Sequence, residues 1–340
     1  RSVIKRMILH VCDGAIIWLC YSLIFLFLCG TAIGSEVSRP PLLRIGYINS
    51  LTQLPLVIAY ERDQFTYENV RVILENFRSP VELEAAFRVG AVDVAYLPLV
   101  AVLAIYADGI PLGWGESLHK GGSGLLISAE RWQNRHVDGL GVIGIPAIRT
   151  VEHMGLFDLL NRESLEYGLQ CKVRVVRSSE AESNLAAGKV DGLALDEPYL
   201  TKTIESATRE IVQNSYPELP YVLIYRPEVL TEVWRSPLAE WLTGVHRACE
   251  IIAEDINNFG GEQTAMTQSR YLGFDKDLIR RIFQKKQGKL RFGPWDVGSD
   301  EIDAAISKML KLNLLHQMVV LGAPTDTLQR SGEGRNRVTK

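Results

Sequence analysis

The sequence contains little cysteine and no dense run of basic residues. Only five of its 340 residues are cysteine, and three of these, Cys12, Cys20 and Cys29, lie within the first 29 positions. No two cysteines have the CxxC spacing and no cysteine–histidine cluster occurs, so a zinc or iron site is not expected. The 37 Lys and Arg residues are balanced by 40 Asp and Glu residues without a basic stripe, which argues against a nucleic-acid partner.

Signatures of catalysis are also missing. The sequence has no Gly-x-Ser-x-Gly elbow, no phosphate-binding loop, no HExxH helix and no Ser/His/Asp set at recognisable spacing. We therefore predict no catalytic residue, no metal ligand and no cofactor, and we do not expect an enzyme. Cys171 and Cys249 are expected to be separate buried thiols, with a disulfide between them as the alternative.

The first 34 residues differ from the rest of the chain. Arg1, Lys5 and Arg6 precede an uncharged apolar run over 14–30, and small residues stand at the end of the segment. This layout predicts a signal for export to the periplasm, cleaved after Gly34; an uncleaved membrane anchor is the alternative, because the run is almost long enough to span a bilayer. Cleavage would leave 34 basic and 39 acidic residues, a net charge of −5. Contact with a membrane is expected only through this segment.

From residue 41 the sequence alternates short β-rich runs with helical stretches. Strands are expected over 42–47, 70–77 and 92–97, and helices over 53–62 and 80–89. Strand–helix–strand order with short connections predicts a mainly parallel sheet with helices on both faces.

A second unit with the same alternation follows, and the last third of the chain is predicted to be helical. The strands of the second unit are expected over 141–145, 172–177 and 192–195, its helices over 150–160 and 178–187, and the C-terminal helices over 237–259, 275–286 and 299–315.

These patterns predict an α/β protein of two lobes with a ligand cleft between them. Lobe 1 is expected to comprise 41–130 and 227–323, because the C-terminal helices return to the first sheet, and lobe 2 to comprise 131–226. The polar segment 324–340 is expected to be a disordered tail. In such sheets a ligand binds beyond the carboxyl ends of the strands, which here face each other between the lobes.

Five segments, in this order, resemble the type II periplasmic solute-binding proteins of ABC importers. The similarity is to the branch that contains nitrate-, sulfonate- and taurine-binding proteins and the thiamine-pyrimidine, or NMT1-like, binders. The resemblance implies the type II periplasmic binding protein fold and a role in solute capture. The segments are RIGYINSLTQLPLVIAYERDQF (44–65), LEAAFRVGAVDVAYLPLVAVL (83–103), GGSGLLIS (121–128), GVIGIPAIRTVEHMGLFDLL (141–160) and LAAGKVDGLALDEPYLTK (185–202).

Polar residues at the ends of the predicted strands are the candidate ligand contacts. A hydroxyl between a strand and a helix either caps that helix or binds a ligand with the free N–H groups of its first turn. A tyrosine at a strand end is either a wall of the cleft or part of the core. The glycine-rich segment 119–124 is either a ligand loop or a hinge. In the first lobe these considerations select Asn49, Ser50, Thr52, Tyr96, His119 and Ser123.

The second lobe supplies three further candidates. Thr150 is predicted to cap the helix that follows it, and Arg149 beside it could bind a carboxylate, sulfonate or nitrate. Glu197 follows a buried strand, where it either accepts hydrogen bonds from an amino group of the ligand or stabilises the next helix.

The function expected from these residues is capture of a small polar solute for an ABC permease and its ATPase, by a monomer that closes around a hinge. A small oxyanion of the nitrate/sulfonate/taurine class is the favoured solute, and an aminopyrimidine precursor of thiamine is the alternative. An exported sensor domain that uses the same cleft is the alternative from a different class of function.

Overall fold

Two mixed sheets form the framework of the computed structural model. The structure describes residues 39–63, 66–207, 211–214, 219–285, 290–316, 318–321 and 324. Residues from Pro41 onward form a compact unit of their own. The predicted export signal and nearly all of the predicted C-terminal tail lie outside the described residues.

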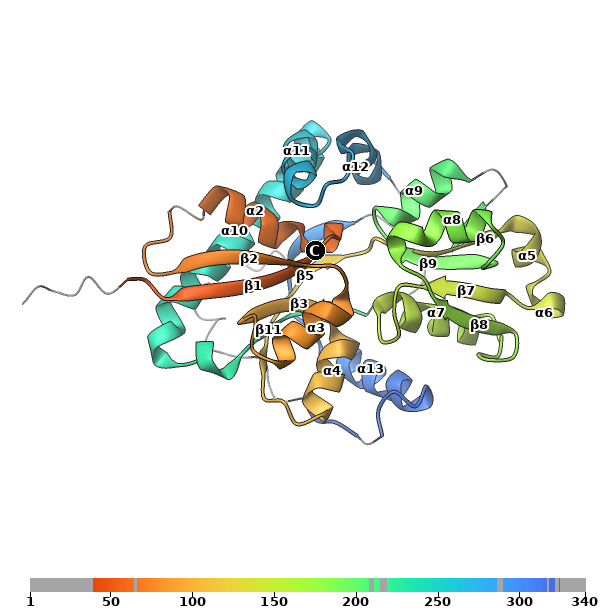
Figure 1. Cartoon of the computed structure of the whole chain (residues 1–340), viewed down its shortest axis with the longest axis horizontal. Helices are drawn as coiled ribbons and strands as arrows, with labels where there is room; N and C mark the ends of the chain where they lie inside the picture. Colours follow the sequence, from red (N-terminus) through yellow and green to blue (C-terminus); the bar gives the residue numbers. More distant parts are fainter. Residues whose placement is uncertain are drawn as a thin grey trace, which may run out of the picture. The chain divides into compact units, whose positions relative to one another are not determined.

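The first sheet has a parallel centre and an antiparallel side. Strand β1 pairs in parallel with β2 and with β3, whereas β11 is antiparallel to both β3 and β4. Figure 1 shows β1 and β2 beside one another, with β3 and β11 on the other side of β1. The strand order is β2 (Arg71–Phe77), β1 (Leu42–Ile48), β3 (Val94–Pro98), β11 (Tyr221–Tyr225) and β4 (Gly113–Trp114).

The second sheet repeats this plan. Its parallel strands are β9, β7 and β8, and β6 lies antiparallel between β9 and β10. The strand order is β10 (Ile211–Asn214), β6 (Ser123–Ser128), β9 (Gly192–Asp196), β7 (Gly141–Ile145) and β8 (Cys171–Val175).

The chain passes from the first sheet to the second and then back to the first, and we call each of these crossings an exchange. Strand β6, which precedes residue 131, pairs in the second sheet, and β11, which precedes residue 227, pairs in the first sheet. Each exchange therefore lies a few residues before the predicted limit between the lobes. We call the first sheet with its helices lobe 1, and the second sheet with its helices lobe 2.

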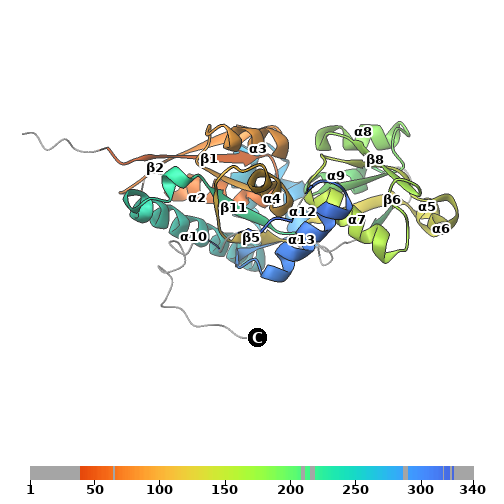
Figure 2. The ribbon, with the colours of Figure 1, turned by 90° about the horizontal axis from the view of Figure 1, so that it is seen from below.

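Helices cover both faces of the first sheet, as Figures 1 and 2 show. Leucine, isoleucine and valine side chains of the sheet pack on each face against apolar side chains of these helices. One face carries α2 (Leu54–Asp63), α10 (Arg235–Phe259), α11 (Glu262–Tyr271) and α12 (Lys276–Phe283), and the other carries α3 (Pro80–Arg88), α4 (Leu99–Ala107) and α13 (Ser299–Lys311).

The second sheet is covered in the same way. Helix α7 (Val151–Arg162) packs on one face, with Trp132 of α5 (Ala129–Gln133) at its edge. Helices α8 (Ala181–Ala186) and α9 (Tyr199–Ser206) pack on the other face. The short pieces are α6 (Arg135–Asp138), η1 (Leu51–Gln53), η2 (Ser178–Glu180), η3 (Pro227–Val229) and η4 (Glu232–Trp234).

The α/β fold class predicted from the sequence is confirmed, but the last third of the chain is not helical throughout. Strand β12 (Arg291–Trp295) pairs with β5 (Ser117–Lys120) in a separate two-stranded sheet. Its sequence, RFGPW, contains glycine and proline, which are rare inside strands, so no local pattern identified it. The prediction of a purely helical C-terminal region was therefore wrong.

The two described cysteines are both buried and unpaired, which confirms the expectation of separate thiols. Burial raises the pKa of the Cys171 thiol to about 12, so the group is held in its neutral form. Within the described part of the chain, none of the helices has the length and apolar character that a membrane crossing requires.

Candidate functional site

The loop after β1 carries a chain of polar side chains that ends on the other lobe. Ser50 is the N-cap of η1, and its Oγ accepts a hydrogen bond from the backbone N–H of Thr52 at 3.3 Å. The same Oγ donates to Oδ2 of Asp196, in lobe 2, at 2.7 Å. The predicted helix cap at Ser50 is therefore present, and its hydroxyl also joins the two lobes.

The chain continues inward from Ser50. The hydroxyls of Ser50 and Thr52 lie 3.0 Å apart, and Nε2 of Gln53 donates to Oγ1 of Thr52 at 3.2 Å and to the backbone oxygen of Tyr96 at 3.3 Å. All of these side chains are buried. We call Gln53, Thr52, Ser50 and Asp196 the polar chain.

Asp196 lies at the carboxyl end of β9, opposite Ser123 in the ladder between β6 and β9. Its carboxyl group is buried among like charges: burial, followed by the charge of Glu152, raises its pKa from 3.8 to about 8, and Glu197 adds to the rise. The hydrogen bond from Ser50 acts in the opposite direction but does not outweigh burial. At neutral pH this carboxyl group therefore keeps its proton.

The N-terminus of α7 brings Glu152 to this place. Thr150 caps the helix as predicted, because its Oγ1 accepts the N–H of His153 at 3.3 Å and donates to the backbone oxygen of Ala147 at 3.1 Å. Val151 packs in the core cluster that includes lobe 1, so the first turn of α7 lies against both lobes. Glu152 lies in this first turn, and from there its charge acts on Asp196.

Glu197 follows Asp196, but both of its oxygens are occupied. Oε2 accepts the backbone N–H of Thr201 at 3.1 Å and Oε1 accepts its hydroxyl at 2.8 Å, both in the first turn of α9. Nζ of Lys285, from lobe 1, lies 3.2 Å from Oε1. In the structure, Glu197 therefore binds the start of the helix that follows it, and it also forms an ion pair between the lobes.

Tyr96 and His119 lie in a buried aromatic cluster with Tyr221. The ring centroids of His119 lie 5.6 Å from Tyr96 and 5.1 Å from Tyr221. The Tyr96 hydroxyl accepts the backbone N–H groups of Leu118 and His119 and lies 2.9 Å from Nδ1 of His119. Burial lowers the pKa of His119 to about 3, so its ring is neutral.

The other predicted residues have separate surroundings. Asn49 is exposed and accepts a hydrogen bond from Asn76 at 2.6 Å. Arg149 has a φ of 64°, and its guanidinium lies 3.6 Å from Oε1 of Glu84 in lobe 1. Ser123 is buried at the start of β6. The structure therefore brings Ser50, Thr52, Tyr96 and Ser123 to one region around Asp196 and Gln53, whereas Asn49 and Arg149 have protein partners elsewhere.

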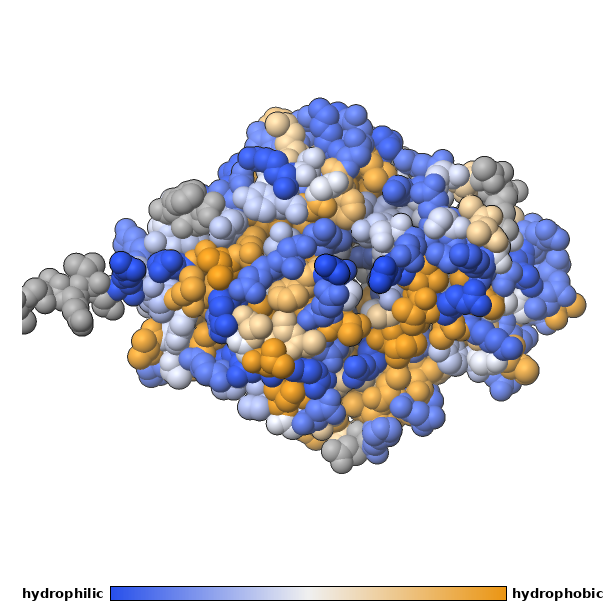
Figure 3. Space-filling model, in the orientation of Figure 1, coloured by the Kyte–Doolittle hydropathy of each residue, from blue (hydrophilic) through white to orange (hydrophobic). Residues whose placement is uncertain are grey.

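Ion pairs line the contact between the lobes. Two ion pairs, those of Arg149 and Lys285, have been described above. In a third, Nζ of Lys308 of α13 lies 2.5 Å from Asp158 of α7. In a fourth, Arg281 of α12 binds Glu205 of α9 through two hydrogen bonds of 2.8 Å. Figure 3 shows a narrow recess on one face, bordered by hydrophilic side chains. Polar contacts around the polar chain thus join the lobes, next to the apolar contacts that Val151 and Met154 of α7 make with the core clusters of lobe 1.

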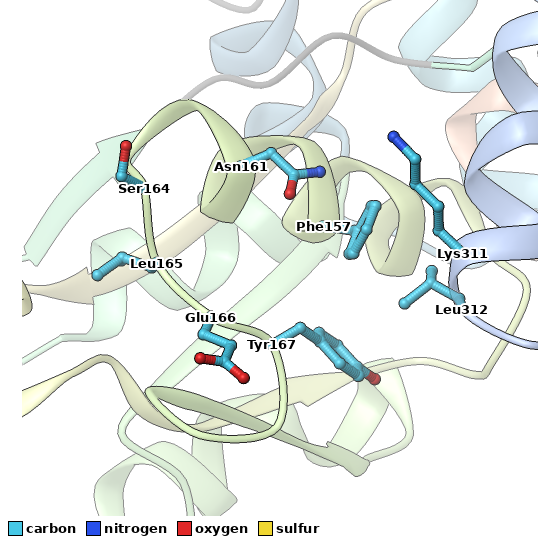
Figure 4. A pocket seen from close by; sticks show the side chains of 8 residues that line it. All are labelled: Phe157, Asn161, Ser164, Leu165, Glu166, Tyr167, Lys311 and Leu312. Atoms are coloured by element: carbon cyan, nitrogen blue, oxygen red, sulfur yellow. The ribbon is translucent and has the colours of Figure 1, made fainter.

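A shallow pocket of about 430 Å³ lies beside this contact (Figure 4). Helix α7, the loop that follows it and the end of α13 provide its walls, and none of the predicted site residues lines it. Its residues are Phe157, Asn161, Ser164, Leu165, Glu166, Tyr167, Lys311 and Leu312.

Sequence reasoning did not select Gln53, Glu152, Asp196 or Lys285. Asp196 stood in the same motif as Glu197, and its place as the last residue of a buried strand was the available signal. Gln53 stood next to two selected hydroxyls. Lys285 carried no signal, because its partner Glu197 is 88 positions away in the sequence.

Solved structures with a similar fold include binding proteins of ABC-type import systems. The ligand-binding component of an ABC-type import system from Staphylococcus aureus, solved with zinc bound, is 13% identical, with a TM-score of 0.72 over 86% of this chain and 100% of that one. The alkanesulfonate-binding protein SsuA from Xanthomonas axonopodis pv. citri, bound to MOPS, is 15% identical, with a TM-score of 0.66 over 83% and 96%. The periplasmic nitrate-binding protein NrtA from Synechocystis PCC 6803 is 13% identical, with a TM-score of 0.68 over 86% and 85%.

The fold is therefore that of the type II periplasmic binding proteins, as predicted. The sequence profile of the NMT1-like family matches residues 37–215, which is more than half of the chain. The chain belongs to the NMT1-like family, and the resemblance found in the sequence is confirmed. A comparison with curated proteins gave no match.

Proposed function

We propose that this protein is the substrate-binding component of an ABC importer, which captures a small polar solute between its lobes and delivers it to a permease and its ATPase. The observation that carries the proposal is the buried hydrogen bond from Ser50 to Asp196. It joins the loop after the first strand of lobe 1 to the carboxyl end of a strand of lobe 2, which is where ligands bind in open α/β sheets.

Closure around a hinge is the proposed mechanism. The chain passes from β5 to β6 through Gly121 and Gly122, which have φ values of 83° and 99°, where residues with a side chain are strained. A solute bound to one lobe recruits the other lobe, and closure removes water from the solute. The ion pair of Lys308 with Asp158 and that of Lys285 with Glu197 hold the closed arrangement.

The membership of the NMT1-like family and the fold shared with binding components of import systems support this function. A periplasmic location, a monomeric state and the absence of catalysis belong to the same proposal. The binding energy must come from a few well-placed polar contacts, since a small solute buries little surface.

The experiment is a thermal-shift screen of small polar metabolites, followed by small-angle scattering with each solute that stabilises the protein. A ligand at 100 times its dissociation constant stabilises by roughly 2.7 kcal/mol. We expect at least one solute to raise the unfolding temperature and reduce the radius of gyration, with weaker binding in Ser50→Ala. Stabilisation without compaction, or equal affinity in Ser50→Ala, would contradict capture between the lobes.

A further inference from the structure

The hydrogen bond between Ser50 and Asp196 crosses the contact between the lobes, and one of its two groups can change its charge. Ser50 belongs to the loop after β1 in lobe 1, Asp196 ends β9 in lobe 2, and the two oxygens lie 2.7 Å apart. Asp196 is buried, with 8% of its surface exposed. Separation of the lobes would break this bond and bring water to the carboxyl group. Asp196 therefore has different surroundings in the closed and in the open arrangement.

Lobe 2 itself places charged and titratable groups around Asp196. Glu152 lies in the first turn of α7 and Glu197 follows Asp196 in the chain, and the charges of both raise the pKa of Asp196. Both stay with Asp196 when the lobes part. At the start of α9, burial and the charge of Asp196 raise the pKa of Tyr199 above its usual value of 10, so this hydroxyl does not titrate near neutral pH.

Lobe 1 contributes a hydroxyl, a cation and the cover over the carboxyl group. The Ser50 hydroxyl lies 3.0 Å from that of Thr52, and Nζ of Lys285 lies 3.2 Å from Oε1 of Glu197. Burial is the main cause that raises the pKa of Asp196 to about 8, in spite of the bond to Ser50. Since lobe 1 supplies part of that burial, opening removes part of the main cause and moves the pKa of Asp196 back toward its usual 3.8.

We propose that closure of the lobes takes up a proton at Asp196, so that the closed arrangement is favoured as the pH falls and the open arrangement as it rises. The proton comes from the solvent, binds a carboxylate oxygen of Asp196 as lobe 1 covers it, and returns to the solvent on opening. Ionisation in the closed contact would instead add a negative charge next to those of Glu152 and Glu197, in a place shielded from water. This inference rests on the hinge motion of the proposed function and holds for any captured solute.

Proton linkage gives the sign and the size of the effect. At low pH the carboxyl group is protonated in both arrangements, and well above pH 8 it is ionised in both, so the ratio of closed to open protein is constant at either end. Between these limits closure binds up to one proton, and the ratio of closed to open protein falls by up to about 10-fold for each unit by which the pH rises.

His246 is a second group whose titration has to be told apart from that of Asp196. Burial lowers its pKa, but the hydrogen bond and charge of Glu116 outweigh burial and raise it above 6.5. His246 lies in α10 and Glu116 lies between β4 and β5, so both belong to lobe 1. Opening does not separate this pair, and a pH dependence that disappears in Asp196→Asn cannot come from it.

The experiment measures the distance between the lobes in the full chain, without solute, by pulsed electron paramagnetic resonance from pH 5 to pH 9. Spin labels are attached to cysteines that replace Val89, at the end of α3 in lobe 1, and Val137 of α6 in lobe 2, which are 80% and 87% exposed. Both described native thiols are buried and do not compete for the label, because burial raises the pKa of Cys171 to about 12 and that of Cys249 further. The remaining cysteines are replaced by serine; these are Cys12, Cys20 and Cys29.

We expect a closed and an open population in the wild type, with a ratio of closed to open protein that falls by at least about 10-fold between pH 6 and pH 8. Asp196→Asn should give the same ratio at every pH, since asparagine has no proton to exchange. Asp255→Asn is the matched control and should keep the wild-type pH profile, because Asp255 is a buried acid of α10 that accepts the N–H of Thr264 at 2.7 Å, away from the polar chain.

Two results would overturn the inference. One is a distance distribution of the wild type that does not change with pH, and the other is a pH dependence that Asp196→Asn retains. In either case the solute screen decides the proposed function separately, because compaction by a solute requires no dependence on pH.

Discussion

Replacement of Asp196 by asparagine should stabilise the protein, and the gain should grow with pH. Asparagine keeps the shape of the side chain and can still accept the hydrogen bond from Ser50, but it carries no charge. The rise in the pKa of Asp196 from 3.8 to about 8 corresponds to roughly 6 kcal/mol between the protonated and ionised forms in the folded protein. This free energy is the cost of ionising Asp196 in the folded protein, and Asp196→Asn removes that cost.

The sign of the effect follows from proton linkage. Below about pH 4 the carboxyl group is protonated in both the folded and the unfolded chain, so it contributes no pH dependence. Between pH 4 and pH 8 the unfolded chain ionises while folded Asp196 holds its proton, and the free energy of unfolding falls by up to about 1.4 kcal/mol per pH unit. Above pH 8 the folded group is also ionised and the full cost is present.

The assay is urea unfolding of the wild type and Asp196→Asn at intervals from pH 4 to pH 9.5. The difference in unfolding free energy should rise in favour of the variant by several kcal/mol over this range, since the effects of titrating groups that do not interact with Asp196 cancel. Ser50→Ala is the matched control, because it removes the hydrogen bond and keeps the charge, and it should retain the wild-type slope. Parallel pH profiles for the wild type and Asp196→Asn would refute the account of Asp196.

Three further changes test the contacts around the site. Lys285→Met leaves the buried carboxylate of Glu197 without its cation and should lower the free energy of unfolding by about 2–3 kcal/mol in urea titrations at pH 7. A double-mutant cycle of Lys308→Gln and Asp158→Asn should give a coupling energy of about 1 kcal/mol, because both side chains are mostly buried. Gly122→Ala should cost about 1–3 kcal/mol in thermal unfolding, because its φ is 99° and an added methyl group would meet a neighbouring side chain.

Each of these has an outcome that would contradict it. An unchanged urea midpoint in Lys285→Met would mean that Glu197 does not depend on this cation, and a coupling energy of zero would remove the Lys308 pair from the forces that hold the lobes. For Gly122, the matched control is Gly109→Ala, which has a φ of 77° but open space around the added methyl group. The added methyl group of Gly122→Ala would lie 2.9 Å from Cδ1 of Leu290, and equal losses in the two variants would show that this contact contributes nothing.

Local signals in the sequence identified the parts of the site that depend on neighbours along the chain. Ser50 and Thr150 stand between a strand and a helix, and both cap the helix that follows, because the orphan N–H groups of a first turn need an acceptor close in sequence. The apolar runs of the parallel strands are also signals between neighbours along the chain, so the sequence identified these strands.

Features that depend on distant segments could not be obtained in this way. Asp196 and Glu197 are adjacent acids after one strand, and their different roles follow from Ser50 on one side and Lys285 on the other. Only the packed structure brings those partners together. Strand β12 exists because β5 offers it an edge, although its own sequence does not favour a strand.

The exchange of strands between the sheets has a consequence for synthesis of the chain. The first sheet needs β11 between β3 and β4, and β11 follows every strand of the second sheet in the sequence. As the polypeptide emerges, lobe 2 can therefore complete its sheet first, while lobe 1 waits for residues 221–225 and for the helices beyond them. A fragment that stops before β11 would contain the beginning of lobe 1 and yet be unable to finish it.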